Sequence, residues 1–348
     1  MNQLGTGIAI TGSGSAASEV TLDNHQLSQM VDTSDEWITS RTGIQKRHLM
    51  DAQGSLSEMA AGAARGAIAM AGIAPDDLDL IILATSTPDD LFGSANQVQA
   101  LLGASKAVAF DITAACSGFV FGLATASQFI RTGVYQNVLL IGADILSRWV
   151  DWSDRSTCVL FGDGAGAVVL QANQSDRLLG FALCSDGTQN SCLQLAYKSQ
   201  QQEIVKGLTV AKGTYQPITM SGKEVYRFAV QKVPEVIEKA LFRADISTEQ
   251  VDWLVLHQAN QRILDGVAQR LKIPNHKVLS NLAQYGNTSA ASIPIVLDEA
   301  VRLEKIKSGD IIVTSGFGAG LTWGAAVFQW GRLVDSRQKY HKGCQSLK

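Results

Sequence analysis

The sequence predicts an α/β fold built from two similar halves. Continuous apolar segments at residues 79–84 and 138–142 have the composition of strands that are buried on both faces of a sheet. Residues 79–83 match residues 252–256, and residues 137–141 match residues 310–314, in both cases 173 residues later. Strands that alternate with helical patterns, repeated in one register, indicate a duplicated α/β fold with a mostly parallel or mixed sheet.

Local signals predict the elements of the first half. Residues 5–12 are expected to form a first strand with a glycine turn. A good capping residue opens a helix within residues 33–43, and Gly43 closes it. The segment Ser55–Glu58 has the pattern of a capping box before an alanine-rich helix that runs to about Ala71.

Cys116 follows a β-rich segment at residues 108–112 and precedes a buried helical pattern. At the start of a helix, free N–H groups and the helix dipole stabilise a thiolate, which would make this side chain a nucleophile. The alternative is a buried structural cysteine, which is the commoner role of a lone cysteine. This stretch alone leaves both interpretations open.

In the second half, His257 comes just past a buried strand, and Asn287 lies in a glycine-rich segment before another helix. A core histidine and a helix cap are the alternatives for these two residues. Catalytic groups of α/β sheets collect at the carboxyl ends of strands. In a duplicated topology the loops that carry Cys116, His257 and Asn287 can converge, so we expect one active site there.

Between the halves, residues 185–218 are polar and irregular, and we predict a loop insertion. We therefore expect an N-terminal half at residues 1–175 that carries the cysteine, and a C-terminal half at residues 176–333 that carries His257 and Asn287. Residues 334–348 are polar without a period and are expected to be a flexible tail.

Composition limits the function classes. The net charge of −3 argues against a general binder of nucleic acid or anionic membranes. No apolar run approaches the roughly 20 residues of a transmembrane helix, and no secretory signal is visible. The five cysteines lack C-x-x-C spacing, and the five histidines lack metal-ligand spacing. We expect a cytoplasmic protein with reduced thiols, no metal, and no nucleic-acid or membrane partner.

Several motifs together resemble one family, the β-ketoacyl-acyl carrier protein synthases III, condensing enzymes that initiate type II fatty acid synthesis. The motifs are Thr33–Ile38 with Arg41–Ile44, Ala114–Gly118, Phe161–Gly166, His257–Asn260, Gly286–Ser292 and Gly316–Gly324. The resemblance covers nearly all of residues 5–330. It implies the thiolase fold, a duplicated α-β-α-β-α five-layered sandwich, and a homodimer.

The resemblance also implies a mechanism without a cofactor, in which acyl-CoA is a substrate. Cys116 would take the acyl group from a short acyl-CoA, with acetyl-CoA as the expected primer. Malonyl-acyl carrier protein would then lose CO₂, and His257 and Asn287 would hold the enolate oxygen. An oxyanion hole for acyl transfer would use the Cys116 amide and the loop Gly318-Ala319-Gly320. The family usually has three glycines here, so Ala319 is a departure.

Further residues are assigned through the same resemblance. For CoA they are Trp37 and Arg155 on the two faces of the adenine, Arg41 near the phosphates, and Asn260 and Gly222 along the pantetheine tunnel. Carrier protein is acidic and would dock on Arg262, Arg227 and Arg270. The primer pocket would include Phe161, Phe317 and Phe92, the last reaching across the dimer.

Other functions remain as alternatives. A thiolase would need a second catalytic cysteine in a Cys-x-Gly context, which Cys344 does not provide. A hydroxymethylglutaryl-CoA synthase or a specialised-metabolite ketosynthase would share the fold, and a non-catalytic partner subunit would lack an intact Cys–His–Asn set. A cysteine hydrolase is disfavoured because Asn287 would serve an enolate rather than orient the histidine.

Overall fold

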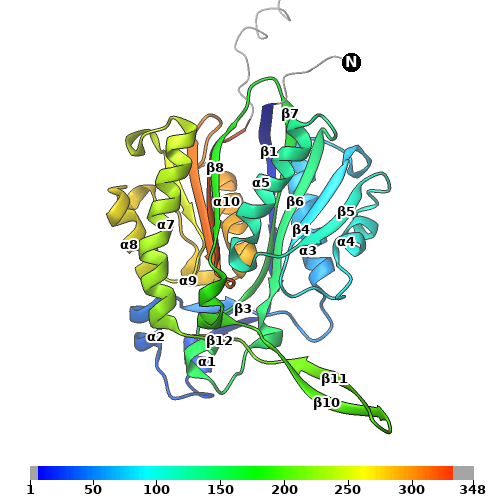
Figure 1. The fold of residues 1–348 in the computed structure, drawn as a ribbon. Helices are drawn as coiled ribbons and strands as arrows, with labels where there is room; N and C mark the ends of the chain where they lie inside the picture. Colours follow the sequence, from blue (N-terminus) through cyan, green and yellow to red (C-terminus); the bar gives the residue numbers. More distant parts are fainter. Residues whose placement is uncertain (1–6, 332–348) are drawn as a thin grey trace, which may run out of the picture.

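A computed structural model describes residues 7–331 as an α/β structure with two central sheets (Figure 1). The first sheet has the strand order β1 (Gly7–Ala16), β7 (Asp163–Asn173), β6 (Asn137–Ile145), β4 (Leu80–Ala84) and β5 (Val108–Ile112). The second has the order β13 (Trp253–Leu256), β14 (Ile311–Gly318), β15 (Thr322–Gln329) and β8 (Leu178–Ser185). The α/β prediction is therefore confirmed.

The two sheets repeat one pairing pattern. In the first, β4 runs parallel to β6 and β6 antiparallel to β7; in the second, β13 runs parallel to β14 and β14 antiparallel to β15. Leu80 pairs with Val138, and Trp253 pairs with Ile312, so the offset is 173 at one strand and 174 at the next. The repeat predicted from the sequence is present, but its second strand is shifted by one residue.

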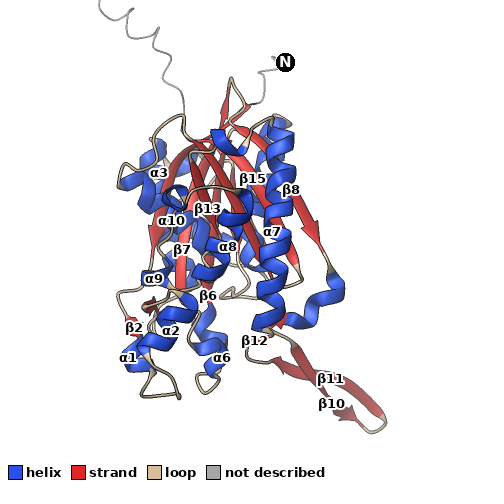
Figure 2. Ribbon diagram, turned by 90° about the vertical axis from the view of Figure 1, so that its left-hand side faces the viewer, coloured by secondary structure: helices blue, strands red, loops and turns tan. Residues whose placement is uncertain are grey.

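Helices cover and separate the sheets in five layers (Figure 2). α3 (Leu56–Ala71) packs on the first sheet with α4 (Ala95–Leu102) beside it, and α7 (Gly222–Ala244) packs on the second with α8 (Gln261–Leu271). Between the sheets lie α5 (Gly118–Arg131) and α10 (Ser292–Arg302), which contact strands of both. Three clusters of buried apolar side chains hold these layers together: one lies between α3 and the first sheet, one around α5 and α10 between the two sheets, and one between α7, α8 and the second sheet.

The predicted helix ends are confirmed. α2 (Asp35–Thr42) begins after Ser34, whose side chain accepts a hydrogen bond from the Trp37 amide, and ends at Gly43 with φ +84°. Ser55 caps α3 in the same way by accepting from the amide of Glu58. The predicted first strand at 5–12 corresponds to β1, which continues to Ala16.

The prediction of an irregular loop at residues 185–218 is wrong in its central part. Residues 197–215 form a projecting hairpin of β10 (Tyr197–Val205) and β11 (Leu208–Tyr215), visible at the lower right of Figure 1. Gly207, with φ +83°, closes its turn. The strands are exposed along almost their whole length, so no buried face imposes the apolar alternation by which strands are predicted.

Short elements gather at the lower end of the molecule, where the candidate site lies (Figure 1). They are α1 (Asn24–Leu27), α6 (Arg155–Cys158), α9 (Leu282–Tyr285), β2 (Thr21–Asp23), β3 (Lys46–His48), β9 (Leu193–Gln194) and β12 (Thr219–Met220). The tail predicted at 334–348 lies outside the described residues. Within residues 7–331, no helix has the length and apolar character needed to cross a membrane.

Candidate active site

Cys116 lies in a short 3₁₀ turn, η2 (Ala115–Ser117), that leads directly into α5. The turn needs a left-handed backbone at Ala115, with φ +46°. Strand β14 presses against it: a Cβ added to Gly318 would meet the Cys116 nitrogen at 2.6 Å. The cysteine is 7% exposed, so the fold holds this thiol at the head of a central helix with little access to bulk water.

The environment of Cys116 favours the thiol in the resting protein. Burial raises the pKa of Cys116 to about 12, and a hydrogen bond from Ser289 opposes that rise only in part. The predicted position at a helix start is correct. Burial is the largest cause of the raised pKa, so the packing around Cys116 opposes the stabilisation of a thiolate that a helix start provides.

His257 follows β13 directly, as predicted, and is 2% exposed. Its Nδ1 lies 2.7 Å from the Ser292 hydroxyl, which also accepts the Gln258 amide at 3.3 Å. Burial lowers the pKa of His257 to about 3, so the ring is neutral at physiological pH. If the Ser292 hydroxyl donates to Nδ1, the ring proton lies on Nε2, which then serves as a hydrogen-bond donor.

Asn287 lies between α9 and the 3₁₀ turn η7 (Ser289–Ala291) and is 7% exposed. Its backbone is bridged to Phe161: the Asn287 amide donates to Leu160 at 2.9 Å, and its carbonyl accepts from Gly162 at 3.0 Å. Its side-chain oxygen accepts from the Ser289 amide at 2.9 Å. This bond occupies the oxygen, which leaves the NH₂ group as the end available to another acceptor.

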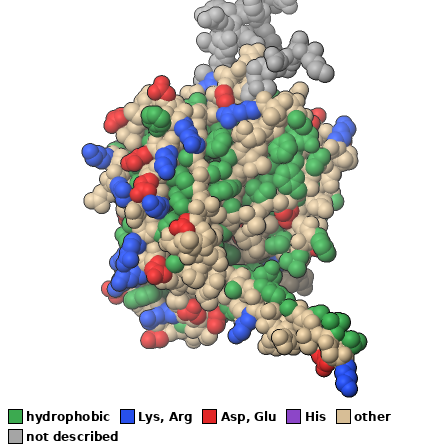
Figure 3. Space-filling view, viewed as in Figure 1, with side chains coloured by type: hydrophobic (Ala, Val, Ile, Leu, Met, Phe, Trp, Pro, Cys, Tyr) green, Lys and Arg blue, Asp and Glu red, His purple; other side chains and the backbone are tan. Residues whose placement is uncertain are grey.

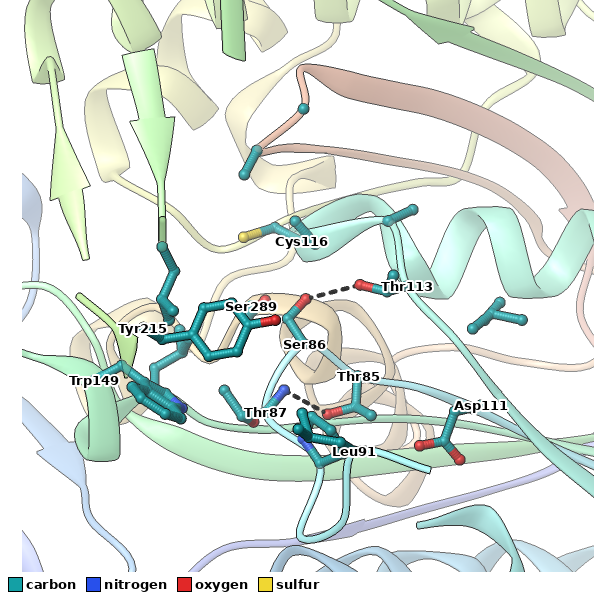
Figure 4. A pocket seen from close by; sticks show the side chains of 18 of the residues that line it. Thr85, Ser86, Thr87, Leu91, Asp111, Thr113, Cys116, Trp149, Tyr215 and Ser289 are labelled. Atoms are coloured by element: carbon teal, nitrogen blue, oxygen red, sulfur yellow. Dashed lines mark hydrogen bonds between the residues drawn. The ribbon is translucent and has the colours of Figure 1, made fainter. Parts of the chain in front are cut away.

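A cavity of about 1340 Å³ opens beside the thiol. Figure 4 shows Cys116 above Ser289 on its wall, with the loop Thr85–Thr87 below. Of the predicted site residues, its lining contains Cys116, Phe161, Phe92, Ala319 and Gly320. His257 and Asn287 are joined to this wall through η7 and the first residue of α10, so the three predicted catalytic residues converge.

The predicted oxyanion loop follows β14 and returns through β15, so that Ala319 and Gly320 line the cavity together with Cys116. Ala319 is not among the described residues with positive φ; the left-handed position is Gly320, with φ +130°. An alanine therefore fits the second position of this loop without backbone strain.

The residues assigned to adenine lie against one another. The guanidinium carbon of Arg155 lies 4.9 Å from the Trp37 ring centroid, and its Nη1 donates to the Asp32 carbonyl at 2.7 Å. Trp37 is 36% exposed. A flat base fits between them only after one of the two side chains has moved.

The remaining CoA candidates lie around the same end of the molecule. The Asn260 amide donates to the Arg41 carbonyl at 3.2 Å, and its oxygen caps α8 at 2.9 Å. Gly222 is the first residue of α7, beside β12. None of these residues, nor Trp37 or Arg155, lines the cavity at Cys116, so the structure does not join the predicted CoA surface to that cavity.

The three candidate docking arginines are exposed on α7 and α8, which pack together. Arg227 and Arg262 lie near the N-terminal ends of these helices, as do Gly222 and Asn260. Arg270 is eight residues beyond Arg262, about 12 Å along the helix axis, and lies 4.0 Å from the Glu235 carboxylate.

The predicted primer-pocket residues divide into two groups. Phe161 and Phe317 are buried, and Phe317 stands edge-on to the His257 ring with centroids 5.4 Å apart. Phe92 is 98% exposed at the rim of the cavity. A side chain of this size with so much exposed apolar surface is typical of a contact site.

Three polar residues of the site were missed by the sequence analysis. Ser292 and Ser289 lie inside the Gly286–Ser292 motif, but their partners depend on the tertiary structure. Asp144 is a buried carboxylate on β6. Its signal was visible as a charged residue in an otherwise apolar strand, since buried charges need compensating partners. Within residues 7–331, no group of three or more His, Cys, Asp or Glu side chains could hold a metal.

Comparisons with known proteins identify the relatives of this chain. Residues 110–187 match the 3-oxoacyl-(acyl-carrier-protein) synthase III family, and residues 241–330 match that family's C-terminal model. A beta-ketoacyl-(acyl-carrier-protein) synthase III of Trichormus variabilis is 74% identical over 94% of this chain and 99% of its own.

Solved structures of similar proteins have the same fold as this chain. The 3-oxoacyl-(acyl-carrier-protein) synthase III of Aquifex aeolicus superimposes with a TM-score of 0.86 at 44% identity, over 93% of this chain and 100% of its own. The priming β-ketosynthase of the R1128 polyketide pathway gives 0.85 at 30% identity, over 93% and 96%.

Proposed function

The chain belongs to the 3-oxoacyl-(acyl-carrier-protein) synthase III family, and on that premise we propose that it condenses a short acyl-CoA with malonyl-acyl carrier protein through an acyl group on Cys116. The proposal identifies it as an acyltransferase that initiates type II fatty acid synthesis on a duplicated thiolase fold. The observation that carries the residue assignments is the convergence of Cys116, His257 and Asn287 around η7.

In the first half-reaction, the Cys116 sulfur attacks the thioester carbonyl of acyl-CoA, and CoA leaves. The negative oxygen of the tetrahedral intermediate needs donors at the position where its charge develops. The Cys116 amide and the amides of the Gly318–Gly320 loop are suited to this, because that loop returns along the same wall as the thiol. Acetyl-CoA is the proposed primer.

In the second half-reaction, malonyl-acyl carrier protein loses CO₂ and leaves an enolate. The neutral imidazole of His257 and the NH₂ group of Asn287 act as hydrogen-bond donors to the enolate oxygen. Two features support these roles: burial keeps His257 uncharged, and the Ser289 amide already occupies the Asn287 oxygen. The enolate carbon then attacks the acyl-cysteine and gives the β-ketoacyl product.

We further propose that the active form is a homodimer. Strand β5 is at the free edge of the first sheet and its side chains are half-buried or exposed. Hydrophobic side chains gather over α5 and β5 on the face shown in Figure 3. Phe92 and Leu91, at 98% and 81% exposed, stand beside the cavity and would be covered by a second copy. Each protomer of the proposed dimer contains both halves, residues 1–175 and 176–333.

No bound cofactor or metal takes part in this proposal, and both substrates are water-soluble carriers, which agrees with a cytoplasmic location. The alternatives are less well supported. The priming β-ketosynthase of the R1128 polyketide pathway shares the fold but is only 30% identical to this chain. The synthase III of Trichormus variabilis is 74% identical, which favours the synthase III function. A non-catalytic subunit would not need the buried Cys–His–Asn set.

Mass spectrometry of the intact protein after exposure to a panel of acyl-CoAs tests the proposal. We expect one acyl group, located on Cys116 by peptide mapping and absent in Cys116→Ser. Cys158→Ala and Cys184→Ala are matched controls that should retain it. An acyl group on any other cysteine, or none from any acyl-CoA, would overturn the proposed function.

A further inference from the structure

Two hydroxyl side chains join the turn that carries the nucleophile to the strand that follows the oxyanion loop. Ser117 comes directly after Cys116 in η2 and is buried. Thr322 is the first residue of β15 and lines the cavity beside the thiol. The two Oγ atoms lie 2.8 Å apart, although the residues are 205 positions apart in the chain. The condensation chemistry described above uses neither side chain.

The positions of the protons show that a bond between the two hydroxyls is always present. The two groups have two protons between them, and the contact at 2.8 Å needs one of these. If Thr322 donates it, the Ser117 proton goes to the Ala114 carbonyl at 2.6 Å. If the serine donates it, the proton of the threonine goes to one of two carbonyls at 3.1 Å, those of Ala114 and Ala319. Both arrangements contain the bond between Ser117 and Thr322.

This bond holds one of the two arms of the oxyanion loop against η2. On the β14 arm, a Cβ added to Gly318 would meet the Cys116 nitrogen at 2.6 Å, so strand and turn lie closer than a side chain allows. Gly318 pairs with Thr322 across the loop, which places the bond to Ser117 on the β15 arm. The loop is therefore held to the nucleophile turn on both sides of Ala319.

We propose that Ser117 and Thr322 are positioning residues that set the distance between the Cys116 amide and the amides of the oxyanion loop, an inference that rests on the proposed function. Both kinds of amide have to reach the same oxygen of the tetrahedral intermediate. They belong to segments distant in the chain, so a contact between those segments has to fix their spacing. Misplacing a catalytic group by about 1 Å costs up to about 10²-fold in rate.

The fold itself does not require the Ser117 hydroxyl. The second half has an equivalent turn, η7, which leads into α10 as η2 leads into α5. The first residue of each turn has a positive φ, +46° at Ala115 and +51° at Ser289. Ala291 therefore corresponds to Ser117, and the same turn forms there without a hydroxyl. This comparison supports a role of the Ser117 hydroxyl in the site rather than in the turn.

Backbone bonds keep the loop folded when a hydroxyl is removed. The Leu321 amide donates to the Asp186 carbonyl at 2.9 Å, and the Leu321 carbonyl accepts from the Asp186 amide at 2.8 Å. The strands on either side stay paired up to Gly318 and Thr322. Loss of the hydroxyl bond is thus expected to shift the loop relative to η2 without unfolding it.

The chain offers matched variants for this test. Thr322→Val removes the hydroxyl and keeps a β-branched side chain, which suits a strand. Thr322→Ser restores the hydroxyl, and Ser117→Ala removes its partner. Thr314→Val is the control: the Thr314 hydroxyl is buried on β14 and donates to the Val255 carbonyl of β13 at 2.9 Å, on the side of β14 opposite to β15.

Two reactions of Cys116 distinguish a displaced oxyanion loop from a disturbed thiol. Acetyl transfer from acetyl-CoA passes through a tetrahedral intermediate, whereas alkylation by iodoacetamide does not. Single-turnover acetylation at saturating acetyl-CoA is expected to slow at least about tenfold in Thr322→Val and in Ser117→Ala. It recovers in Thr322→Ser and is native in Thr314→Val. Alkylation of Cys116, measured by peptide mass spectrometry, keeps its native rate in all four variants.

The double variant tests whether the two hydroxyls act through one bond. If they do, Ser117→Ala combined with Thr322→Val is acetylated no more slowly than the slower single variant. Independent losses that multiply, a native acetylation rate in Thr322→Val, or equal slowing of acetylation and alkylation overturns the proposal. Acetylation of the native chain is scored separately, and its failure would instead refute the proposed function.

Discussion

The guanidinium of Arg155 lies directly over the Trp37 ring, with its central carbon 4.9 Å from the ring centroid. In the proposed CoA site these two groups hold the adenine between them, so the free protein has them in contact where the base would enter. The Arg155 side chain is held from the other side by the Asp32 carbonyl at 2.7 Å. Binding of CoA therefore has to exchange a cation–π contact for two stacking contacts.

Trp37→Ala is expected to raise the KM for acyl-CoA by about tenfold, since one stacking face is worth roughly 1–2 kcal/mol. Arg155→Ala should have a smaller effect, because it removes the other face but also opens the space. Malonyl-carrier kinetics should barely change in either variant, because the carrier brings no adenine. Steady-state kinetics with each substrate varied in turn measures this, and a larger KM for Arg155→Ala than for Trp37→Ala would contradict it.

Removing a hydrogen-bond donor to the enolate oxygen should slow the second half-reaction and leave the first largely unchanged. His257→Ala and Asn287→Ala are each expected to slow malonyl decarboxylation by about 10²–10³, the usual cost of removing one oxyanion donor. Acylation of Cys116 should persist in both, because the donors proposed for that step are the backbone amides of Cys116 and of the Gly318–Gly320 loop. Radiolabelled malonyl-carrier turnover and acyl-enzyme formation measure the two steps, and equal loss of both in His257→Ala would make this residue a base for the cysteine.

Burial of a neutral histidine should appear in the pH dependence of stability. Burial lowers the pKa of His257 from 6.5 to about 3. Between these values the unfolded chain binds the proton and the folded chain does not, so stability falls as the pH decreases through this window. Relative to His257→Gln, the native chain should lose up to about 1.4 kcal/mol per pH unit there. Denaturant unfolding at several pH values tests this; parallel curves for the two proteins would refute a buried neutral ring.

The oxyanion loop offers a matched set of glycine and alanine variants. Because the backbone φ of Ala319 is not positive, a glycine is not needed at this position. Ala319→Gly should therefore change acylation rates by no more than about twofold. Gly318→Ala should nearly abolish acylation, since its Cβ would meet the Cys116 nitrogen at 2.6 Å and displace the nucleophile. Pre-steady-state acylation kinetics compares the two, with circular dichroism as the check on folding. A normal rate in Gly318→Ala would show that the loop and thiol are not held this closely.

The sequence was sufficient where local chemistry decides the structure. Ser34, Ser55 and Gly43 end their helices for reasons contained within a few residues. Cys116 was predicted directly before a buried helix, and His257 directly after a buried strand. In an α/β sheet the loops that follow the carboxyl ends of the strands lie at the same edge.

What the sequence did not predict depends on groups distant in the chain. The hairpin at 197–215 has no buried face, so its strands show no apolar alternation. Burial of Cys116 raises the pKa of its thiol, and this burial comes from the packing of both halves, which the residues around the helix start do not reveal. The bonds of Asp144 reach residues on β4's following loop and on η7, 146 positions away at Ala290. No short motif could contain that relationship.

Arg262→Glu is expected to slow the carrier-dependent step and leave acyl-CoA use nearly unchanged. Carrier protein is acidic, and Arg262 stands in the first turn of α8 beside Asn260, near the proposed mouth. Reversing its charge turns attraction into repulsion, and the defect should grow at low ionic strength as screening weakens. Arg270→Glu is the matched control: it makes the same charge change on the same helix about 12 Å away, at a residue that already faces Glu235. Kinetics with malonyl-acyl carrier protein at two salt concentrations distinguishes them, because a general effect of net charge would slow both variants alike, whereas docking at the mouth slows Arg262→Glu far more.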